Sequence, residues 1–478
     1  LENFGVSNGQ SGATSELATA TSPAATAVDP FNNIKMESTL VTIDNASKVY
    51  GDLYFKAGQG LNMANSLYRW DTEAIKQGHL STATRRKTNN DESGYINEGI
   101  VSVWGGVDYK GKASPITGMN VVYGTIHNKD TGKVYVDHGA AIVGTDDSIL
   151  KNEGKVVVTG KYDPSGQNTI ANTSLNANKS LVATRGAAET APTGKNYGIV
   201  GISDGYVGYN YANENNFTGV DNSIAIRHED GKIYVAGEKS TGIYVENKND
   251  GLASGVTIDY INTKAGTTGI DVSNSDVTAP DARGVGIALV NSNTNYANGS
   301  ANAGGVINLT GASDGAFAGW GTKATNFAPG SLDIKLGKND IFTGKNGVGI
   351  YAESAEINLL SDKFTVQTED NGVGLWAMDD SHVAPGANHQ KTFQYNYHGA
   401  NDKNGFAMAF GGRNIQKTTA SNDLDIKFTN KADTGVTLQA EKAGTTTGTT
   451  KGIAGILVNT NDHGDTVTNR GNIEEDSS

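Results

Sequence analysis

One glycine-led unit recurs along this chain and restricts its possible folds more than any other feature. The clearest copy is Gly347-Val348-Gly349-Ile350-Tyr351-Ala352-Glu353-Ser354-Ala355-Glu356-Ile357-Asn358-Leu359-Leu360. It predicts a glycine corner, a short strand, a polar turn and a second strand in which apolar and polar residues alternate. Alternation with period 2 is typical of a strand with one buried face. Further copies begin at Gly242, Gly269, Gly284, Gly304, Gly372 and Gly452.

The spacing of these copies is recurrent but irregular, as in a solenoid with inserted loops. A single unit of this size cannot bury its own apolar face, so each unit must stack on the next. We therefore expect one elongated all-β body. Asn-Glu-Gly turns that lead into alternating strands, at 97–99 and 152–154, support the same interpretation because Asn and Gly tolerate tight turns.

The composition agrees with a thin, stacked core. Only 36% of the residues are hydrophobic, which is less than an ordinary globular domain contains. The 62 glycines suit corners and close backbone approaches. The 8 prolines are few, as expected where central strands cannot accommodate proline.

Charge and cysteine content limit the function classes. With 38 basic and 51 acidic residues the net charge is −13, which disfavours nucleic acid as a partner. The chain contains no cysteine, so it has neither disulfides nor thiolate metal sites. An extracellular protein without disulfides points to a bacterial surface rather than to a small secreted eukaryotic module. No apolar run approaches the length of a membrane helix, and the abrupt ends suggest a fragment of a longer protein.

Three regions are expected. Residues 1–30 are small and polar and predict a flexible or extended N-terminal segment. Residues 31–94 are expected to form an N-terminal cap region, with a short helix near 62–77 where Met63, Leu67, Trp70 and Ala74 follow helical spacing. Residues 95–478 are expected to form the repetitive rod.

Inserted loops are predicted at about 204–220, 311–329 and 382–404. Such loops on a rigid scaffold often carry function, and aromatic side chains dominate binding surfaces and stack on sugars. The candidate binding residues are Tyr206, Tyr209, Tyr211, Trp320, Tyr395, Tyr397 and His398. The alternative is that these aromatic residues only fix their loops to the rod.

No pattern in the sequence indicates catalysis or a bound ion. The adjacent carboxylates Asp146-Asp147 and Asp379-Asp380 would face opposite sides of a strand, whereas a glycosidase needs two converging carboxylates. The eight histidines show no metal-ligand spacing, and no nucleophile elbow is present. We expect no enzyme activity, no cofactor and no metal.

The Gly-Val-Gly-Ile-Tyr-Ala unit at 347–359, the Asn-Glu-Gly turns and the cysteine-free composition resemble the passenger domain of a large monomeric type V autotransporter adhesin, in particular the fusobacterial outer-membrane adhesins. The resemblance covers about residues 95–478. It implies a right-handed parallel β-helix, displayed at the bacterial cell surface as a monomeric rod tethered to an outer-membrane β-barrel outside this fragment. It also implies attachment to host-cell receptors and coaggregation with partner bacteria, and through these biofilm formation and virulence.

Three functions therefore stand at this point. The first is an adhesin segment that binds a host-cell surface protein or glycan, or the surface of partner bacteria. The second is a carbohydrate-active β-helix enzyme, a lyase or hydrolase. The third is a structural spacer that holds a binding tip elsewhere in a longer adhesin.

Overall fold

A computed structural model shows an all-β fold of stacked parallel strands, without a helix in the residues that it describes. The described residues are 40–43, 48–50, 61–62, 94–103, 116–122, 125–136, 138–145, 148–160, 195–203, 224–237, 239–247, 256–264, 268–273, 284–291, 305–312, 337–378, 381–385, 391–399, 404–412, 424–430, 453–460 and 473–476. Their strands form three parallel sheets, which we call sheets A, B and C. The predicted parallel β-helix is thus confirmed.

Up to β27, each sheet takes one strand from each turn of the chain. Sheet A contains β1 (Leu40–Ile43), β4 (Gly94–Asn97), β7 (Thr125–Asn128), β10 (Ser148–Asn152), β13 (Ile224–Glu229), β16 (Val256–Ile261), β19 (Val306–Thr310), β22 (Glu356–Leu359) and β25 (His382–Pro385). Sheet B contains β2 (Lys48–Tyr50), β5 (Ile100–Val103), β8 (Lys133–Val136), β11 (Lys155–Val158), β14 (Lys232–Ala236), β17 (Gly269–Ser273), β20 (Ile341–Thr343), β23 (Lys363–Thr368), β26 (Lys391–Tyr397), β28 (Leu424–Asn430) and β30 (Ile473–Asp476). Sheet C contains β3 (Leu61–Asn62), β6 (Ile116–Val122), β9 (Gly139–Thr145), β12 (Tyr197–Ser203), β15 (Thr241–Asn247), β18 (Val285–Asn291), β21 (Val348–Glu353), β24 (Val373–Met378), β27 (Gly405–Gly412) and β29 (Ile453–Thr460).

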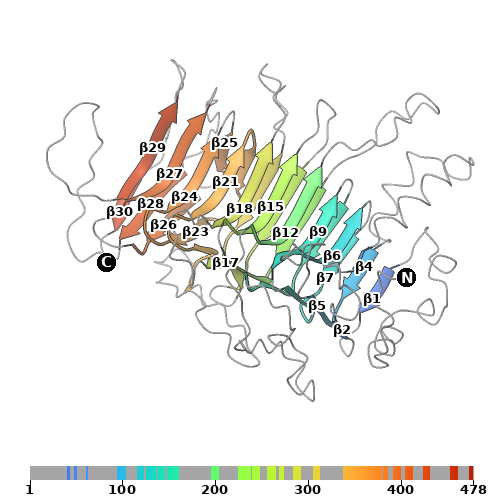
Figure 1. Ribbon diagram of the computed structural model, residues 1–478. Coiled ribbons are helices and arrows are strands. Elements are labelled where there is room, and N and C mark those ends of the chain that lie inside the picture. Colours follow the sequence, from blue (N-terminus) through green and yellow to red (C-terminus); the bar gives the residue numbers. More distant parts are fainter. Residues whose placement is uncertain are drawn as a thin grey trace, which may run out of the picture.

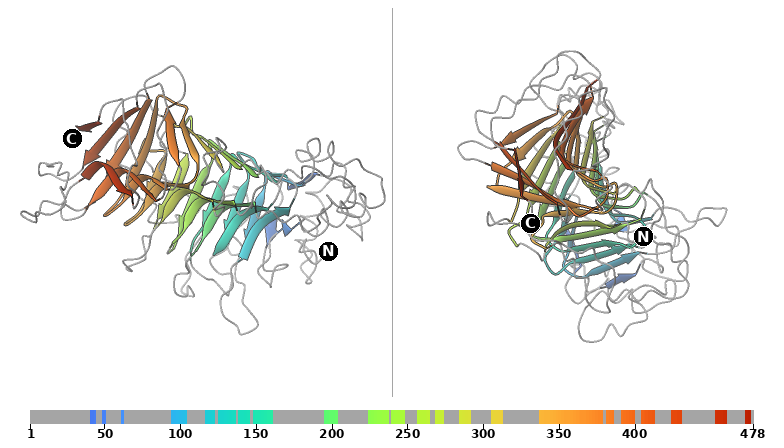
Figure 2. Two further views of the ribbon diagram at one scale, coloured as in Figure 1. Left: turned by 90° about the horizontal axis from the view of Figure 1, so that it is seen from above. Right: turned by 90° about the vertical axis from the view of Figure 1, so that its left-hand side faces the viewer.

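From β1 to β27 the chain passes through the sheets in the order A, B, C and then returns to A one level further along the axis; β28, β29 and β30 then continue sheets B, C and B. Figure 1 shows sheet C as a row of parallel arrows from β6 to β29, and both views of Figure 2 show the strands stacked along one axis. The length of a turn varies widely. The step from Ser148 of β10 to its register partner Ile224 of β13 takes 76 residues, whereas the step from Thr125 of β7 to its register partner Ile149 takes 24. Insertions between strands therefore do not disturb the register of the stack.

Columns of aliphatic side chains run along the inside of the stack. In sheet C one inner column is in register from Met119 through Ile142, Ile199, Ile243, Ile287, Ile350 and Leu375 to Met408, and each of these residues is at most 1% exposed. Sheet B has an inner column from Val101 to Val366. All of these side chains belong to one continuous buried cluster. Burial of the apolar side chain at each of these positions stabilises the rod by about 1.5–3 kcal/mol.

The second glycine of the repeated unit is required by a close approach between turns. A Cβ atom on Gly349 would lie 2.5 Å from the carbonyl oxygen of Gly374 and 2.4 Å from Val366 Cγ1. Gly242 and Gly286 occupy equivalent positions, where a Cβ atom would lie 2.6 and 2.5 Å from the carbonyl oxygen of the next turn. The glycines thus keep free the space in which sheets B and C pack against each other.

Most of the glycine-led copies form strands of sheet C, but those at Gly269 and Gly304 belong to sheets B and A.

A polar ladder follows the corner between sheets A and B inside the stack; it consists of Asn97, Asn128, Asn152 and His228. These residues occupy the same register position in successive turns and are fully buried. Asn97 Nδ2 donates to Asn128 Oδ1 at 2.8 Å, Asn128 Nδ2 donates to Asn152 Oδ1 at 2.8 Å, and Asn152 Nδ2 lies 3.0 Å from His228 Nδ1. Buried polar groups need hydrogen-bond partners. The asparagine of each Asn-Glu-Gly turn finds its partner in the asparagine of the neighbouring turn, which explains why asparagine recurs at this position.

The predicted N-terminal regions can be compared with the structure only in part. The extended segment 1–30 lies outside the described residues, as do residues 63–77 of the predicted helix. Asn62, at the start of that helix, ends strand β3 instead. Strands β1, β2 and β3 pair with β4, β5 and β6, so the stack begins before the predicted boundary at residue 95.

Replacement of Ile350 or Val156 by aspartate is expected to unfold several neighbouring turns. Both side chains are 0% exposed, and an unpaired carboxylate there should lower the free energy of unfolding by more than about 4 kcal/mol. Tyr351→Asp, one residue further along β21 on the partly exposed face, is the matched control and should cost far less. Thermal unfolding followed by circular dichroism measures the difference. Unchanged transitions in both Ile350→Asp and Val156→Asp would contradict the stacked core.

Candidate binding surface

Four of the predicted binding residues cannot be placed. Tyr206, Tyr209, Tyr211 and Trp320 lie outside the described residues, together with almost all of the predicted loops 204–220 and 311–329. The adjacent carboxylates at 146–147 and 379–380 lie outside them as well.

The prediction of a loop at 382–404 is wrong at residues 382–385 and 391–397, where the strands β25 and β26 lie. Tyr395 and Tyr397 lie on β26 and are 0% and 1% exposed, so they are core residues and not binding residues. Tyr395 continues the inner column of sheet B beside Val366, and its hydroxyl donates to the carbonyl oxygen of Gly372 at 2.9 Å. His398 follows the strand and is partly exposed; its Nδ1 lies 3.5 Å from Gln367 Nε2.

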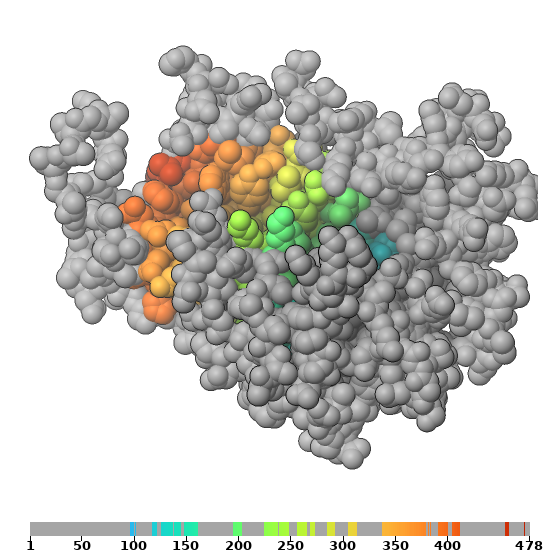
Figure 3. Space-filling view, in the orientation of Figure 1, coloured from blue at the N-terminus to red at the C-terminus, as the bar shows by residue number. Residues whose placement is uncertain are grey.

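Partly exposed aromatic side chains gather instead on the outer face of sheet C. We call Tyr197, Tyr244, Tyr351 and Trp376 the aromatic row. The rings of Tyr197 and Tyr244 have centroids 5.3 Å apart, and those of Tyr351 and Trp376 are 5.8 Å apart in an edge-to-face arrangement. Such pairs add stability beyond their burial. In Figure 3 the coloured band from green to orange lies where Figure 1 draws β12 to β27 of sheet C.

The two ring pairs are separated by a small residue. Tyr244, Ala288, Tyr351 and Trp376 are in register on four successive strands of sheet C. Ala288 is only 3% exposed. Its methyl group is much smaller than the rings of Tyr244 and Tyr351 on either side of it. Other outward positions of sheet C, on strands β12, β18, β24 and β27, are apolar and partly exposed, namely Ile202, Val285, Val290, Val373, Met378 and Phe406.

Two carboxylates give this face a negative character. Glu246 follows Tyr244 by two residues and Glu353 follows Tyr351 by two residues, so both point outward beside the rings. The Tyr351 hydroxyl hydrogen-bonds Glu353. Partial burial, with the charge of Glu246 as the next cause, holds the pKa of Tyr244 and of Tyr197 above the ordinary tyrosine value. The ten strands of sheet C contain no lysine, arginine or histidine.

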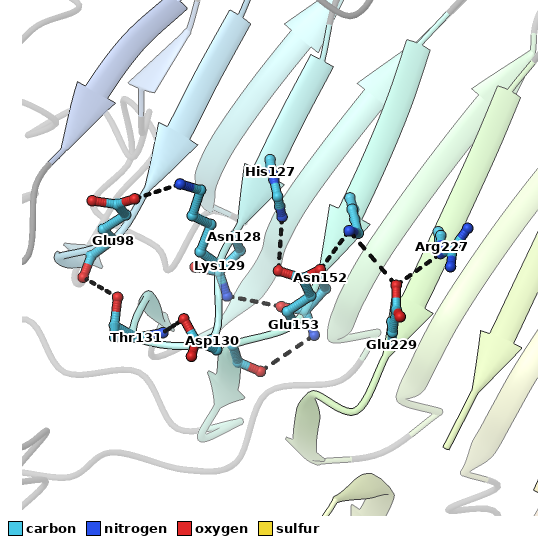
Figure 4. A network of polar contacts seen from close by, with 12 residues as sticks. Glu98, His127, Asn128, Lys129, Asp130, Thr131, Asn152, Glu153, Arg227 and Glu229 are labelled. Carbon is cyan, nitrogen blue, oxygen red and sulfur yellow. Dashed lines mark hydrogen bonds and ion pairs between the residues drawn. The ribbon is translucent and has the colours of Figure 1, made fainter. Parts of the chain in front are cut away.

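Charges on the outer face of sheet A, in contrast, are matched by one another. His127 Nε2 lies 3.0 Å from Glu153, and Lys151 pairs with both Glu153 and Glu229. Arg227 Nε lies 2.9 Å from Glu229. Figure 4 shows this network extending along the corner between sheets A and B, where Lys129 also meets Glu98. The pairs of His127 with Glu153, Lys151 with Glu229 and Lys129 with Glu98 connect successive turns, whereas the other pairs lie within one turn. Partly exposed pairs of this kind each contribute little to stability.

One buried carboxylate has the perturbed pKa that often marks a catalytic acid. Burial raises the pKa of Asp340, which precedes β20, to about 7. Its oxygens accept hydrogen bonds from Asn262 Nδ2 and from the backbone N–H groups of Ala312 and Thr365, at 2.8, 3.0 and 2.9 Å. Because these donors come from three successive turns and the side chain is 0% exposed, Asp340 ties the turns together rather than facing a substrate.

Among the described residues, no three histidine, aspartate or glutamate side chains come together as the ligands of a metal ion would. In the same part of the chain, no helix has the length and apolarity of a membrane span. The aromatic row is therefore the candidate binding surface.

Sequence reasoning missed the aromatic row, although the signal was present. Tyr244, Tyr351 and Trp376 follow the same glycine-led motif at the same offset, and equal offsets in stacked units place side chains in one column.

Comparisons with protein-family models, with curated proteins and with solved structures find no match for this chain.

Asp340 and His228, two buried groups with shifted pKa values, are expected to change the stability of the fold in opposite directions as the pH changes. The folded chain holds the Asp340 proton up to about pH 7, while the unfolded chain releases it near the ordinary value of 3.8. The stability that Asp340 contributes is therefore full below that ordinary value and is lost as the pH rises through about 7. Burial lowers the pKa of His228 from 6.5 to about 4, so its contribution is present above 6.5 and is lost as the pH falls toward 4.

Denaturant unfolding between about pH 4 and 7.5 measures both effects. The destabilisation caused by Asp340→Asn should shrink as the pH rises, and His228→Asn, which extends the polar ladder, should lose less stability in acid than the original chain does. Profiles that run parallel to that of the original chain would contradict these assignments.

Proposed function

We propose that this chain is a non-catalytic segment of a bacterial surface adhesin, and that the outer face of sheet C is an adhesive surface of the rod. The observation that carries the proposal is the aromatic row, which is partly exposed on strands held in register by a buried core. Contiguous apolar patches on the surface of a folded protein mark interaction sites.

The architecture supports binding more than catalysis. Aromatic side chains lose little conformational entropy on binding and dominate the energies of interfaces. Here four of them are mounted on strands, not on loops, so their spacing is fixed before a partner arrives. Preorganisation of this kind lowers the cost of association.

The partners and the location follow from the sequence and its resemblance. The cysteine-free composition and the resemblance to autotransporter passengers favour a monomeric rod on the outer surface of a bacterium. The partners would be a host-cell surface protein or glycan, or the surface of another bacterium. Binding to either would support attachment and coaggregation, and so biofilm formation and virulence.

Substitution of the central rings tests the adhesive surface. Tyr351→Ala combined with Trp376→Ala should weaken binding of the purified chain to host cells and to partner bacteria by at least about tenfold, because one hot-spot aromatic contributes about 2 kcal/mol or more. Flow cytometry of cells with the labelled chain measures this binding. The control combines Thr257→Ala and Thr310→Ala, which lie on the outer face of sheet A, and should bind like the original chain.

The outcomes separate the three functions. Saturable binding that the ring substitutions abolish supports the adhesive surface. No binding by the original chain would make the described rod a spacer. The same preparation is incubated with a panel of glycans, and release of reducing ends or unsaturated sugars that Glu353→Gln removes would indicate an enzyme instead.

A further inference from the structure

The aromatic row combines ring faces with negative charge, which is the combination that attracts cations. Cations lie favourably over the faces of tryptophan and tyrosine rings. On this face Glu246 and Glu353 flank the rings of Tyr244 and Tyr351, and Glu353 is close enough to Tyr244 to help raise its pKa. The strands of sheet C add no positive charge to the face. An acidic ligand would meet repulsion here, whereas a cationic group would be complementary.

The surroundings of the row favour a cation without N–H groups. A primary ammonium or a guanidinium carries three to five donors, each of which needs an acceptor. The outward side chains between and beside the rings are apolar, including Ala288, Val290 and Met378, and the Glu353 carboxylate already accepts from Tyr351. A trimethylammonium group has no donor to satisfy, and its methyl groups can pack on rings and aliphatic side chains. Aromatic recognition of such quaternary ammonium groups is well established for other sites.

We propose that the aromatic row docks on the phosphocholine headgroups of a lipid surface, with the trimethylammonium groups against the rings and the phosphates directed away from Glu246 and Glu353. The inference rests on the proposed adhesive function and names the ligand chemistry of the same face. The two-carbon link between the ammonium and the phosphate allows this orientation.

The rigid spacing of the rings favours a surface over a free small molecule. One contact between a ring and a cation is weak at a partly exposed position. The row extends over strands β12, β15, β18, β21 and β24, which corresponds to about 19 Å at the spacing of neighbouring strands. A face of this length can meet several headgroups at once, and simultaneous contacts convert weak single affinities into stable attachment.

Co-sedimentation of the 478-residue chain with vesicles tests the proposal. The vesicles consist of phosphatidylcholine, of phosphatidylethanolamine, whose headgroup carries a primary ammonium, or of phosphatidylglycerol, whose headgroup is anionic. The chain should bind phosphatidylcholine vesicles at least about fivefold more tightly than the other two. Free phosphocholine should compete only at millimolar concentration, because it can occupy one contact at a time.

Matched variants attribute the binding to the rings. Tyr351→Ala with Trp376→Ala should lose binding to phosphatidylcholine at least about fivefold, while Tyr351→Phe with Trp376→Phe keeps the ring faces and should retain it. Glu246→Gln with Glu353→Gln should weaken it, because the negative potential is removed. Circular dichroism of each variant verifies the fold, and Thr257→Ala with Thr310→Ala again serves as the control.

Three results would overturn the proposal: no binding to phosphatidylcholine, equal binding to all three vesicle types, or retained binding in the double alanine variant. The proposed adhesive function is separable from it. If the alanine variant loses attachment to cells while the original chain ignores phosphatidylcholine vesicles, the adhesive surface stands and its ligand is of another class.

Discussion

Strand pairing between successive turns is the constraint on which this structure depends. No strand of the three sheets pairs with its neighbour in sequence; each takes its partners from the turns before and after it. One turn alone leaves its backbone N–H and C=O groups and its apolar face unpaired, so a turn is stable only within the stack. Parallel pairing also fixes the register, and with it the side chains that lie above one another. The 76-residue turn that starts at β10 keeps its strands in register with those of the 24-residue turn before it.

Because the strands are in register, residues at equivalent positions of successive turns form columns, and each column has a physical role. The inner column through Ile350 fills the core, and the column through Gly349 leaves room for the approach of neighbouring backbones. The polar ladder from Asn97 to His228 satisfies buried amides by pairing each with the next turn. On the outside the same rule assembles the aromatic row. A surface built in this way inherits the rigidity of the core beneath it.

The sequence predicts the architecture well because the architecture is local and repeated. The unit at 347–360 contains a corner, its strands and their alternation within fourteen residues, and the structure places β21 and β22 there. The Asn-Glu-Gly turns at 97–99 and 152–154 likewise lie at equivalent corners between sheets A and B.

The candidate site was harder to predict because it depends on register between distant residues. Ala288 and Tyr351 become neighbours only when the glycine-led units at 284–288 and 347–351 are aligned. The repeated motif predicts the strands, but the column of outward side chains is found only by comparing residues at equal offsets in successive units. Tyr395 and Tyr397 were misassigned for a related reason. Phe393, Tyr395 and Tyr397 alternate as one face of a strand, but aromatic residues among polar ones also resemble a loop. Only the pairing of β26 with β23 and β28 shows that they point into the core.

The register itself can be measured with pairs of introduced cysteines, since the chain has none of its own. Thr257 and Val306 are register partners on adjacent turns, although 49 positions separate them in sequence, and neighbouring parallel strands bring Cα atoms within the range that a disulfide needs. Thr257→Cys with Val306→Cys should therefore form an intramolecular disulfide on mild oxidation. Thr257→Cys with Thr310→Cys should not form a disulfide, because Thr310 lies four residues beyond Val306 on the same strand and its Cα atom is about 13 Å further along the strand. Disulfide formation in the first pair alone, read by mass spectrometry, is the result that the stacked structure predicts. Failure of the first pair, or equal oxidation of both, would contradict it.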